Sequence, residues 1–341
     1  VLLFTFYVLY TRMQIILNEF TSFLGKKGER FIIKTGDKKQ EIAIRDVDQI
    51  LIAAASSISV GAIKLALKNE IDIVFLTGYG KPLGRVFPCK LGGTTLTRKK
   101  QTEAYYSQVG AEIAKNLVKG KILNQAYFLK ALSKSRTLNF SEVADQNMAL
   151  AKNIDKLDGL LDDIRDEIFG LEGLAASGYF DCLKALLPFE KRDPEANDEV
   201  NILLNYGYGI LYSETEKACI LAGLDPYFGF LHTDRYNKPS MVLDLIEGFR
   251  PIIVDRAIVT LFTQKQVTDK LFEVHFETKQ KRLEKSGREK VISAVMERLY
   301  TKINYGGKKT TFQDVMLSQA RAVSNYLLGK NKNFEPFVYK W

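Results

Sequence analysis

The sequence is short of the residues that cross-link small proteins or hold structural metals. Its 341 residues include three cysteines, two histidines and one tryptophan. Cys89, Cys182 and Cys219 are far apart and form no CxxC pair, which excludes a disulfide framework and disfavours a structural zinc site. The sequence also lacks the GxSxG elbow and the lysine-serine end of a phosphate-binding loop. Reduced thiols are typical of cytoplasmic proteins, so we expect a cytoplasmic location.

Long apolar runs are scarce as well. The first segment, VLLFTFYVLYTR, is almost wholly apolar, but it is shorter than the roughly 20 residues that span a bilayer. It lacks the basic start and the small-residue cleavage site of a signal peptide. Because Met13 begins a plausible strand, we expect residues 1–12 to be an extension upstream of the natural start. No other segment is long and apolar enough to predict a membrane span.

Acidic residues are outnumbered by basic ones in the C-terminal part of the chain. The net charge is +9, and residues 263–341 supply +8 of it, with 16 basic against 8 acidic residues. Such an excess favours an anionic partner, with nucleic acid first and an acidic membrane surface second. The densest run, KQKRLEKSGREK, is equally consistent with a solvated helix face, so the charge alone does not decide between these interpretations.

The pattern of apolar residues predicts an α+β fold with two domains. Residues 13–90 alternate short β-branched runs with Gly, Lys and Asp turns and include one helical segment, which predicts a small, mainly β domain. Residues 91–102 are rich in Gly, Thr and Lys and predict a linker. Residues 103–330 have helical spacing and predict a larger all-α domain. Residues 331–341 are predicted to be a tail that is mobile or docks on a partner. The helical segments expected are 103–135, 141–170, 171–187, 196–223, 240–263, 267–303 and 312–328.

Two carboxylates interrupt an apolar segment, SMVLDLIEGFR. Asp244 and Glu247 are three residues apart, so a helix places them on one face. Buried carboxylates are costly unless they are paired, hydrogen-bonded or bound to a metal. Arg250 is a candidate partner for Glu247, and a helix-borne ion pair is the simpler interpretation. One of the two histidines, His232, lies upstream, where a core or capping role is the simpler alternative to a metal ligand.

A third carboxylate lies in a segment of small residues, GLEGLAASGYF. Glu172 opens this face, which another helix can approach closely, although a first-turn glutamate favoured by the helix dipole is an alternative. Together, Glu172, His232 and Glu247 offer two carboxylates and one imidazole, a set that suits Mg²⁺ or Mn²⁺ with positions left for substrate oxygens. With a basic surface, this set favours metal-assisted phosphodiester chemistry.

A long apolar segment between these sites is rich in Asn and Tyr. Its polar side chains are expected either to make interior contacts or to line a nucleic-acid path and stack on unpaired bases. The residues concerned are Asn201, Asn205, Tyr206 and Tyr208.

Three blocks, in this order, resemble the CRISPR-associated spacer-acquisition integrases, the "Cas one" family. They read GLEGLAASGYF, NILLNYGYGILYSETEKACILAGLDPYFGFLH and HTDRYNKPSMVLDLIEGFRPIIVD, and the resemblance runs from about residue 13 to about residue 330. The family's metal-ligating glutamate matches Glu172, its histidine matches His232 and its last acidic ligand matches Glu247. The supporting aspartate of the family matches Asp244.

The resemblance implies an activity and partners. It implies a β domain used for homodimerisation and a helical domain that cleaves DNA and transfers strands with Mg²⁺ or Mn²⁺. The reaction inserts short DNA fragments (spacers) into a CRISPR array by attack of a 3′-hydroxyl on a phosphodiester. A small ferredoxin-like protein, "Cas two", is the further partner implied, and no membrane is expected. Two classes stay open: a metal-dependent nuclease that does not integrate, and a DNA-binding scaffold whose carboxylates only form ion pairs.

Overall fold

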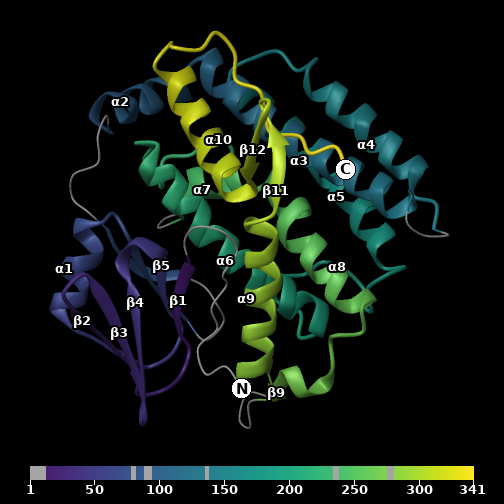
Figure 1. The fold of residues 1–341 in the computed structure, drawn as a ribbon. Coiled ribbons are helices and arrows are strands. Elements are labelled where there is room, and N and C mark those ends of the chain that lie inside the picture. Colours follow the sequence, from purple (N-terminus) through teal and green to yellow (C-terminus); the bar gives the residue numbers. More distant parts are fainter. Residues whose placement is uncertain (1–12, 78–81, 88–93, 135–137, 233–237, 275–279) are drawn as a thin grey trace.

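The N-terminal part of the chain folds into two small β-sheets and one helix (Figure 1). The computed structural model describes residues 13–77, 82–87, 94–134, 138–232, 238–274 and 280–341. The first sheet contains, in spatial order, β1 (Met13–Leu17), β5 (Val47–Ile52), β7 (Asp72–Leu76) and β8 (Pro82–Val86). The second contains β4 (Lys38–Ala43), β3 (Arg30–Thr35), β2 (Phe23–Lys27) and β6 (Ser57–Ile58).

The first sheet is buried on both faces. Successive side chains of a strand point to opposite faces. In β1, Ile15 and Leu17 belong to the core of the β domain, whereas Ile16 joins the core of the helical domain. The pairs β1–β5 and β5–β7 are parallel, and β8 closes the edge antiparallel to β7. The first sheet therefore separates the core of the β domain from the core of the helical domain.

The hairpins and the single helix expected in this region are present. Strands β2, β3 and β4 form an antiparallel meander, and its turns use Gly28 and Gly36 at positive φ. Helix α1 (Val60–Lys68) begins at Ser59, whose hydroxyl accepts a hydrogen bond from the Ala62 amide at 3.1 Å. A serine cap of this kind contributes about 1 kcal/mol.

The rest of the chain is mainly helical and confirms the α+β class (Figure 1). Its helices share one large apolar core. The helices are α2 (Thr94–Tyr105), α3 (Gln108–Lys134), α4 (Ser141–Ile154), α5 (Leu161–Leu183), α6 (Glu199–Leu221), α7 (Ser240–Ile246), a π-helix (Pro251–Asp255), α8 (Arg256–Thr263), α9 (Lys285–Leu299) and α10 (Phe312–Leu327). Two hairpins flank α9: β9 (Phe272–Val274) with β10 (Lys281–Leu283), and β11 (Lys302–Tyr305) with β12 (Lys308–Thr311).

The predicted linker, 91–102, is wrong from residue 94 onward, because α2 begins there. Residues 91–93 lie outside the described residues. The polar composition of this segment suggested a linker, but the segment is a helix that is held in place by its polar side chains. Gln101 is 1% exposed and donates to the main-chain oxygens of Asp225, at 3.0 Å, and Phe228, at 2.5 Å. Hydrogen bonds to a neighbouring loop thus replace the apolar face that usually anchors a helix.

Several predicted helical segments also have different limits. Helix α5 runs unbroken through Gly170, whereas the expected helix 141–170 is interrupted after α4, near Gly159 at φ +140°. The expected helix 240–263 changes to a π-helix at Pro251, which lacks the amide proton that a regular helix needs. The segment 267–303 is helical only in α9, and the β9–β10 hairpin precedes it.

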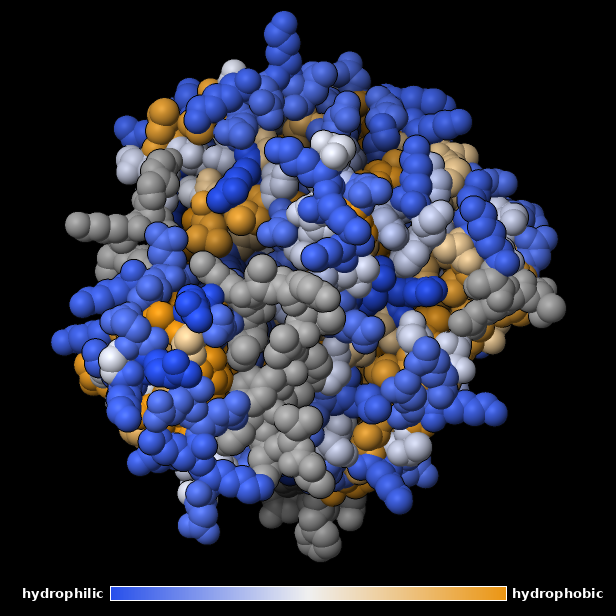
Figure 2. All heavy atoms as spheres, in the orientation of Figure 1, coloured by the Kyte–Doolittle hydropathy of each residue, from blue (hydrophilic) through white to orange (hydrophobic). Residues whose placement is uncertain are grey.

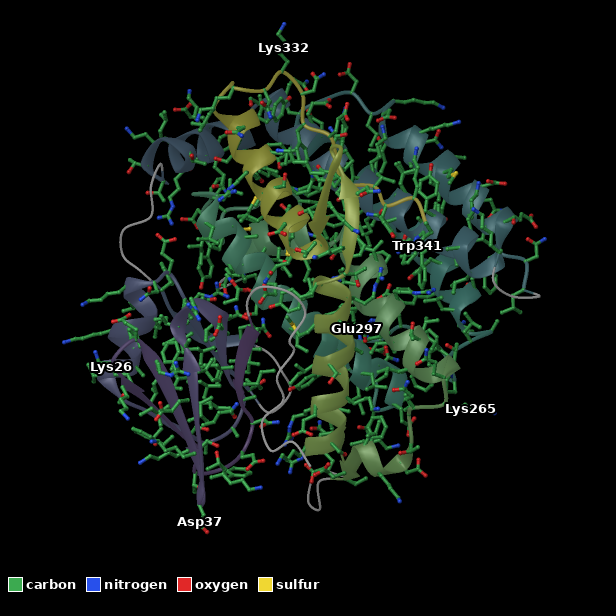
Figure 3. All side chains as sticks on the ribbon, in the orientation of Figure 1. Lys26, Asp37, Lys265, Glu297, Lys332 and Trp341 are labelled. Atoms are coloured by element: carbon green, nitrogen blue, oxygen red, sulfur yellow. The ribbon has the colours of Figure 1, made fainter. Side chains whose placement is uncertain are left out.

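The predicted tail, 331–341, packs on its own chain. Phe334 and Phe337 are buried in the helical core, and Trp341 lies against Phe128 with ring centroids 5.4 Å apart. In Figure 3, Lys332 projects from the edge of the molecule, whereas Trp341 lies over the helices. The expectation that this segment is mobile or docks on a partner is wrong, because its aromatic residues complete the core.

The described surface is largely polar. Charged and polar residues cover most of the face in Figure 2, and the apolar residues there form small, separate patches. None of the described helices is both long and apolar enough to cross a bilayer. Cys182 and Cys219 are free thiols, as expected, while Cys89 lies outside the described residues.

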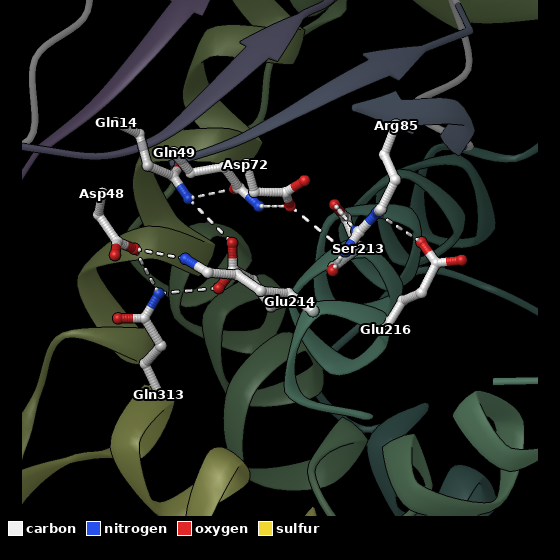
Figure 4. Close-up of polar contacts among 10 residues, drawn as sticks. Gln14, Asp48, Gln49, Asp72, Arg85, Ser213, Glu214, Glu216 and Gln313 are labelled. Atoms are coloured by element: carbon white, nitrogen blue, oxygen red, sulfur yellow. Dashed lines mark hydrogen bonds and ion pairs between the residues drawn. The ribbon is translucent and has the colours of Figure 1, made fainter. Parts of the chain in front are cut away.

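A buried polar cluster joins the first sheet to α6 and α10 (Figure 4). Arg85 of β8 lies 3.3 Å from Asp72 of β7 and 3.0 Å from Glu216 of α6. Lys217 of α6 lies 2.9 Å from Asp48 of β5. These contacts hold the two domains together. The interdomain cluster consists of Gln14, Asp48, Gln49, Asp72, Arg85, Ser213, Glu214, Glu216, Lys217 and Gln313.

Amide side chains complete this cluster around Glu214. Gln14 donates to Glu214 at 3.0 Å and to Gln49 at 2.8 Å. Gln313 donates to the other Glu214 oxygen at 2.8 Å and to Asp48 at 3.0 Å. Burial is the largest influence on Glu214 and raises the pKa of its carboxyl above the usual 4.5.

Candidate functional site

Glu172 lies near the middle of α5 and is 7% exposed. The alternative that it is a first-turn glutamate is therefore wrong. Phe169 precedes it by about one turn and meets the ring of His232 edge to face, with centroids 5.8 Å apart. Phe169 therefore connects α5 to the loop that carries the histidine.

Asp244, in α7, organises the loop that leads to His232. One carboxylate oxygen accepts the amides of Phe230, at 2.6 Å, and Leu231, at 3.0 Å. The other accepts the amide of His232 at 3.0 Å. Gly229 permits this approach, because a Cβ there would lie 2.8 Å from Asp244 Oδ2 and closer still to Ser240. A buried carboxylate with this many donors is a loop anchor.

Asp244 also orients the imidazole. Its Oδ1 lies 2.7 Å from Nδ1 of His232. A carboxylate accepts, so Nδ1 carries the proton and Nε2 is the nitrogen left for a ligand. Burial lowers the pKa of His232, but the hydrogen bond and charge of Asp244, together with the charges of Glu247 and Glu172, outweigh it and raise the pKa above 6.5.

Lys121, in α3, joins the two glutamates. Its Nζ lies 2.6 Å from Oε1 of Glu172 and 2.5 Å from Oε2 of Glu247. Burial opposes its charge, but Glu247 and Glu172 outweigh burial and raise the pKa of Lys121. This residue was not predicted from the sequence. The available signal was slight: Lys121 is followed by two buried amides, Asn124 and Gln125, but it is one of several lysines on the helix.

Arg250 pairs with Glu247, as the sequence spacing predicted. The guanidinium lies 2.9 Å from Oε1 of Glu247. Burial raises the pKa of Glu247, but Arg250, Lys121 and His232 outweigh it and hold the pKa at about 2. Glu247 is therefore ionised at any physiological pH. We call Lys121, Glu172, His232, Asp244, Glu247 and Arg250 the carboxylate site.

The carboxylate site has donors that suit a divalent cation. Within the described ranges, no group of three or more His, Cys, Asp or Glu side chains has the arrangement of a metal site, because Lys121 lies between the glutamates. The ligand set Glu172, His232 and Glu247 therefore stays a prediction. Among the described residues, Glu247 Oε2 is buried and has no hydrogen-bond partner beyond its ion pair. Two carboxylates that share one ammonium, beside an imidazole, fit Mg²⁺ or Mn²⁺ chemically.

A second buried carboxylate lies behind Arg250. Asp255, from the π-helix, accepts the hydroxyls of Tyr208, at 2.5 Å, and Tyr179, at 2.8 Å. Burial raises the pKa of Asp255 to about 6. The Arg250 guanidinium lies over the Tyr208 ring, 4.8 Å from its centroid. Asp255 thus supports the residue that pairs with Glu247, a role not predicted from the sequence.

The Asn and Tyr residues of α6 make mainly interior contacts. Asn201 and Asn205 both accept hydrogen bonds from Arg192, at 2.8 and 2.7 Å. Tyr208 donates to Asp255. The ring of Tyr206 is 2% exposed, and burial raises its pKa to about 12. The interpretation as interior polar contacts is confirmed for Asn201, Asn205 and Tyr208.

The fold and the site define a class: an α+β protein with a strand-rich N-terminal part and a helical domain that gathers two glutamates, an aspartate and a histidine. A model of the family described as "CRISPR associated protein Cas1" matches residues 15–297. The chain belongs to this family, and the resemblance noted from the sequence is confirmed.

Named relatives and solved structures agree with this assignment. A "CRISPR-associated endonuclease Cas1 1" of Archaeoglobus fulgidus is 36% identical and covers 96% of this chain and 100% of its own. A protein of the same name from Pyrobaculum aerophilum is 34% identical over 73% of this chain and 82% of its own. The structure "Casposase bound to integration product" has a TM-score of 0.82 at 27% identity, covering 94% of this chain and 92% of its own. The Cas1 protein of Thermotoga maritima shares the fold, with a TM-score of 0.78 at 21% identity over 95% of this chain and 99% of its own.

Proposed function

We propose that this chain is a metal-dependent DNA endonuclease and integrase that inserts short DNA fragments into a CRISPR array. The observation that carries the proposal is the convergence of Glu172, Glu247 and the His232–Asp244 pair in one site. The Archaeoglobus relative is named an endonuclease, and the casposase structure is titled as bound to an integration product, which supports cleavage and strand transfer.

Each polar residue of the site then has a role. We assign Glu172, His232 and Glu247 as ligands of Mg²⁺ or Mn²⁺. When bound, such a metal stabilises negative charge on the phosphodiester and lowers the pKa of an attacking hydroxyl. Asp244 keeps the proton of His232 on Nδ1, which leaves Nε2 for coordination. Arg250 holds Oε1 of Glu247 and Lys121 holds Oε2, so a bound cation would take the place of the Lys121 ammonium.

DNA would be held by the exposed basic residues rather than by the whole basic run. In the run near α9, Lys281 and Arg282 are only partly exposed, and they pair with Glu199 and Glu273. Lysines of the β11–β12 hairpin and the basic residues of α2 are exposed. Binding through them should weaken with salt, with a logarithmic slope of about −0.9 per phosphate neutralised. These exposed residues are Arg98, Lys99, Lys100, Lys308 and Lys309.

The proposal includes a second copy of the chain and a second protein. Two copies would associate through their β domains, so that two sites act on the two ends of one DNA fragment. The structure titled "Cas6-RT-Cas1--Cas2 complex" has the same fold over 97% of this chain and 36% of its own, which supports a small Cas2-type partner. The substrates are a short duplex with free 3′-hydroxyls and a CRISPR repeat.

A strand-transfer assay tests the proposal. A fluorescent duplex with free 3′-hydroxyls is incubated with a repeat-bearing plasmid and Mn²⁺, using wild type and Glu247→Ala. Glu247→Gln is included because it keeps the side-chain volume beside Lys121 and Arg250. We expect label in the plasmid with wild type only, and retained duplex binding by both variants in a gel-shift measurement.

The assay also separates the alternatives. Nicking without joining, even with the Cas2-type partner added, would favour a nuclease that does not integrate. Bound DNA without any metal-dependent product, together with no stoichiometric Mn²⁺ binding in calorimetry, would leave a DNA-binding scaffold whose carboxylates form ion pairs. Wild-type activity of either Glu247 variant would remove Glu247 from the ligand set.

A further inference from the structure

The last residues of the chain cross the helical domain beside the carboxylate site. We call residues 334–341 the C-terminal strap. Phe334 and Phe337 are buried, and the Phe337 amide donates to Gln319 of α10 at 2.9 Å. Trp341 lies between the guanidinium groups of Arg256 and Arg298, each 5.1 Å from its ring centroid. The strap lies beyond residues 15–297, which the family model matches.

Asn124 ties the strap to the turn that carries Glu247. It lies in α3, three residues after Lys121, and is fully buried. Its amide nitrogen donates to the Gly248 oxygen, at 2.8 Å, and to the Phe337 oxygen, at 2.9 Å. Its side-chain oxygen accepts the Tyr339 amide at 2.8 Å. One side chain therefore links two strap residues to the residue that follows Glu247.

Two further contacts join the strap to the same turn. The ring of Phe337 stacks on that of Phe249, with centroids 5.8 Å apart and planes 16° apart. Arg298, beneath Trp341, donates to the Ile252 oxygen at 3.0 and 3.2 Å. The strap therefore touches this segment directly at Phe249, and reaches it through Asn124 at Gly248 and through Arg298 at Ile252.

This turn needs support from outside. Helix α7 ends at Ile246, and the π-helix begins only at Pro251. Residues 247–249 form a turn in which the Phe249 amide donates to the Ile246 oxygen at 2.9 Å, and Gly248 has open space where a side chain would lie. The Gly248 oxygen is held by Asn124.

We propose that Asn124 and the C-terminal strap are positioning elements for Glu247. The inference rests on the proposed function, because it assigns a role in placing a ligand of that same site. Loss of the strap contacts frees the Gly248 backbone and lets Glu247 drift away from Glu172 and His232. Groups that orient ligands in this way typically change metal affinity or activity by about 10–100-fold when removed.

The chain contains its own reporter of the strap. Trp341 is the sole tryptophan of the sequence, so intrinsic fluorescence follows strap docking without any reaction. Two variants loosen the strap by different means. Asn124→Ala removes its hydrogen bonds. Gly120→Ala adds a Cβ that would lie 2.7 Å from Pro336 Cβ, which pushes the strap away while favouring helix α3. Asn147→Ala is the matched control, because Asn147 is also a buried asparagine that donates to a main-chain oxygen, that of Ala175, away from the strap.

The experiment measures Trp341 emission, Mn²⁺ affinity by calorimetry and single-turnover cleavage over a range of DNA concentrations, all on the full chain. For Asn124→Ala and Gly120→Ala we expect red-shifted emission, Mn²⁺ affinity weaker by about tenfold and a cleavage rate lower by about tenfold, with half-saturating DNA unchanged. Asn147→Ala should lose thermal stability but keep all three properties.

The outcomes are distinguishable. Red-shifted emission with wild-type Mn²⁺ affinity and cleavage overturns the inference but not the proposed function. An equal loss in Asn147→Ala also overturns it, since the effect would then be general destabilisation. If Asn124→Ala does not fold, Gly120→Ala alone decides. A wild-type chain that neither binds Mn²⁺ nor cleaves DNA overturns the proposed function, and the positioning role falls with it.

Discussion

The carboxylate site and the interdomain cluster are both buried groups of charged residues, but they distribute their charges differently. In the interdomain cluster, four carboxylates share Arg85, Lys217 and neutral amides, and burial raises the pKa of Glu214. In the carboxylate site, cations outweigh burial, and the pKa of Glu247 is about 2. His232 is also partly exposed there, with 27% of its side chain accessible.

The difference separates a contact between two domains from a site that is proposed to bind a cation. Amide donors and a buried arginine satisfy carboxylates without requiring another cation, which suits a contact that fixes two domains. A glutamate held ionised among cations, with Oε2 2.5 Å from the ammonium of Lys121, has the charge that a divalent cation would need. Four experiments test this contrast, and they follow from the largest expected effect to the smallest.

The first experiment removes one carboxylate from each region. Glu247→Gln should reduce DNA cleavage by about 10³-fold, to background, because preorganised charge at the reacting phosphodiester is lost. Glu216→Gln, in the interdomain cluster, should keep at least half of the wild-type rate per folded molecule. Single-turnover cleavage with Mn²⁺ makes the comparison. Equal losses in both variants would mean that the two regions do not differ in function.

The second experiment removes Arg85, one of the two cations of the interdomain cluster. Arg85→Ala leaves Asp72 and Glu216 buried without their guanidinium partner, and breaking such pairs costs about 3–5 kcal/mol. Urea denaturation should show this loss. Arg45→Ala is the control, because its side chain is 88% exposed and lies 3.8 Å from the neighbouring Asp46. A loss below 1 kcal/mol for Arg85→Ala would show that Lys217 and the amides hold the interdomain cluster without the guanidinium.

The third experiment uses pH to compare a buried carboxyl from each region. Burial raises the pKa of Asp255 from 3.8 to about 6, so the folded state keeps its proton when the unfolded state has lost it. Stability should therefore fall as pH rises from about 4 to about 6, by roughly 3 kcal/mol at about 1.4 kcal/mol per pKa unit. Asp255→Asn should flatten this part of the stability profile, measured by urea unfolding at successive pH values.

Glu214 provides the counterpart. Its pKa is also raised, with burial the largest cause, so Glu214→Gln should change the pH profile with the same sign. If Asp255→Asn retains the full decline between pH 4 and 6, the ionisation of Asp255 is not its source. If Glu214→Gln makes stability fall more steeply as pH rises, the amide donors of the interdomain cluster stabilise the charged form of Glu214.

The fourth experiment tests an exposed interdomain pair. Lys285 of α9 lies 2.6 Å from Glu19, and its side chain is 39% exposed. Lys285→Met keeps the aliphatic stem and removes the charge, so the loss should be at most about 1 kcal/mol and should shrink in high salt. Urea unfolding at low and high NaCl measures it. A loss of stability as large as that of Arg85→Ala would show that the Lys285–Glu19 pair contributes as much as the interdomain cluster.

Much of the fold was predictable from local patterns. The side chains of β1 alternate between two cores, the meander turns at glycines and α1 is capped by Ser59. These features depend on neighbouring residues, so local sequence patterns reveal them. The helical limits were less predictable. Helix α2 reads as a linker because the contacts of Gln101 come from a loop more than a hundred residues away.

The candidate site was predicted in part for the same reason. Asp244, Glu247 and Arg250 are close in sequence, and their spacing indicated a shared face and an ion pair, which Glu247 and Arg250 form. The contact of His232 with Asp244 also links near neighbours. Lys121 escaped prediction because the two amides that follow it in the sequence do not indicate which carboxylates its ammonium meets.

By itself, the sequence indicated the fold class, the location of many strands and helices, and the residues proposed to bind a cation. These follow from the alternation of apolar side chains and from the chemistry of each residue type. Tertiary structure alone decided that Lys121 lies between the glutamates, that amides and Arg85 join the domains, and that the last residues pack behind Glu247. Such contacts connect residues far apart in the chain, so they exist only once the helices have packed.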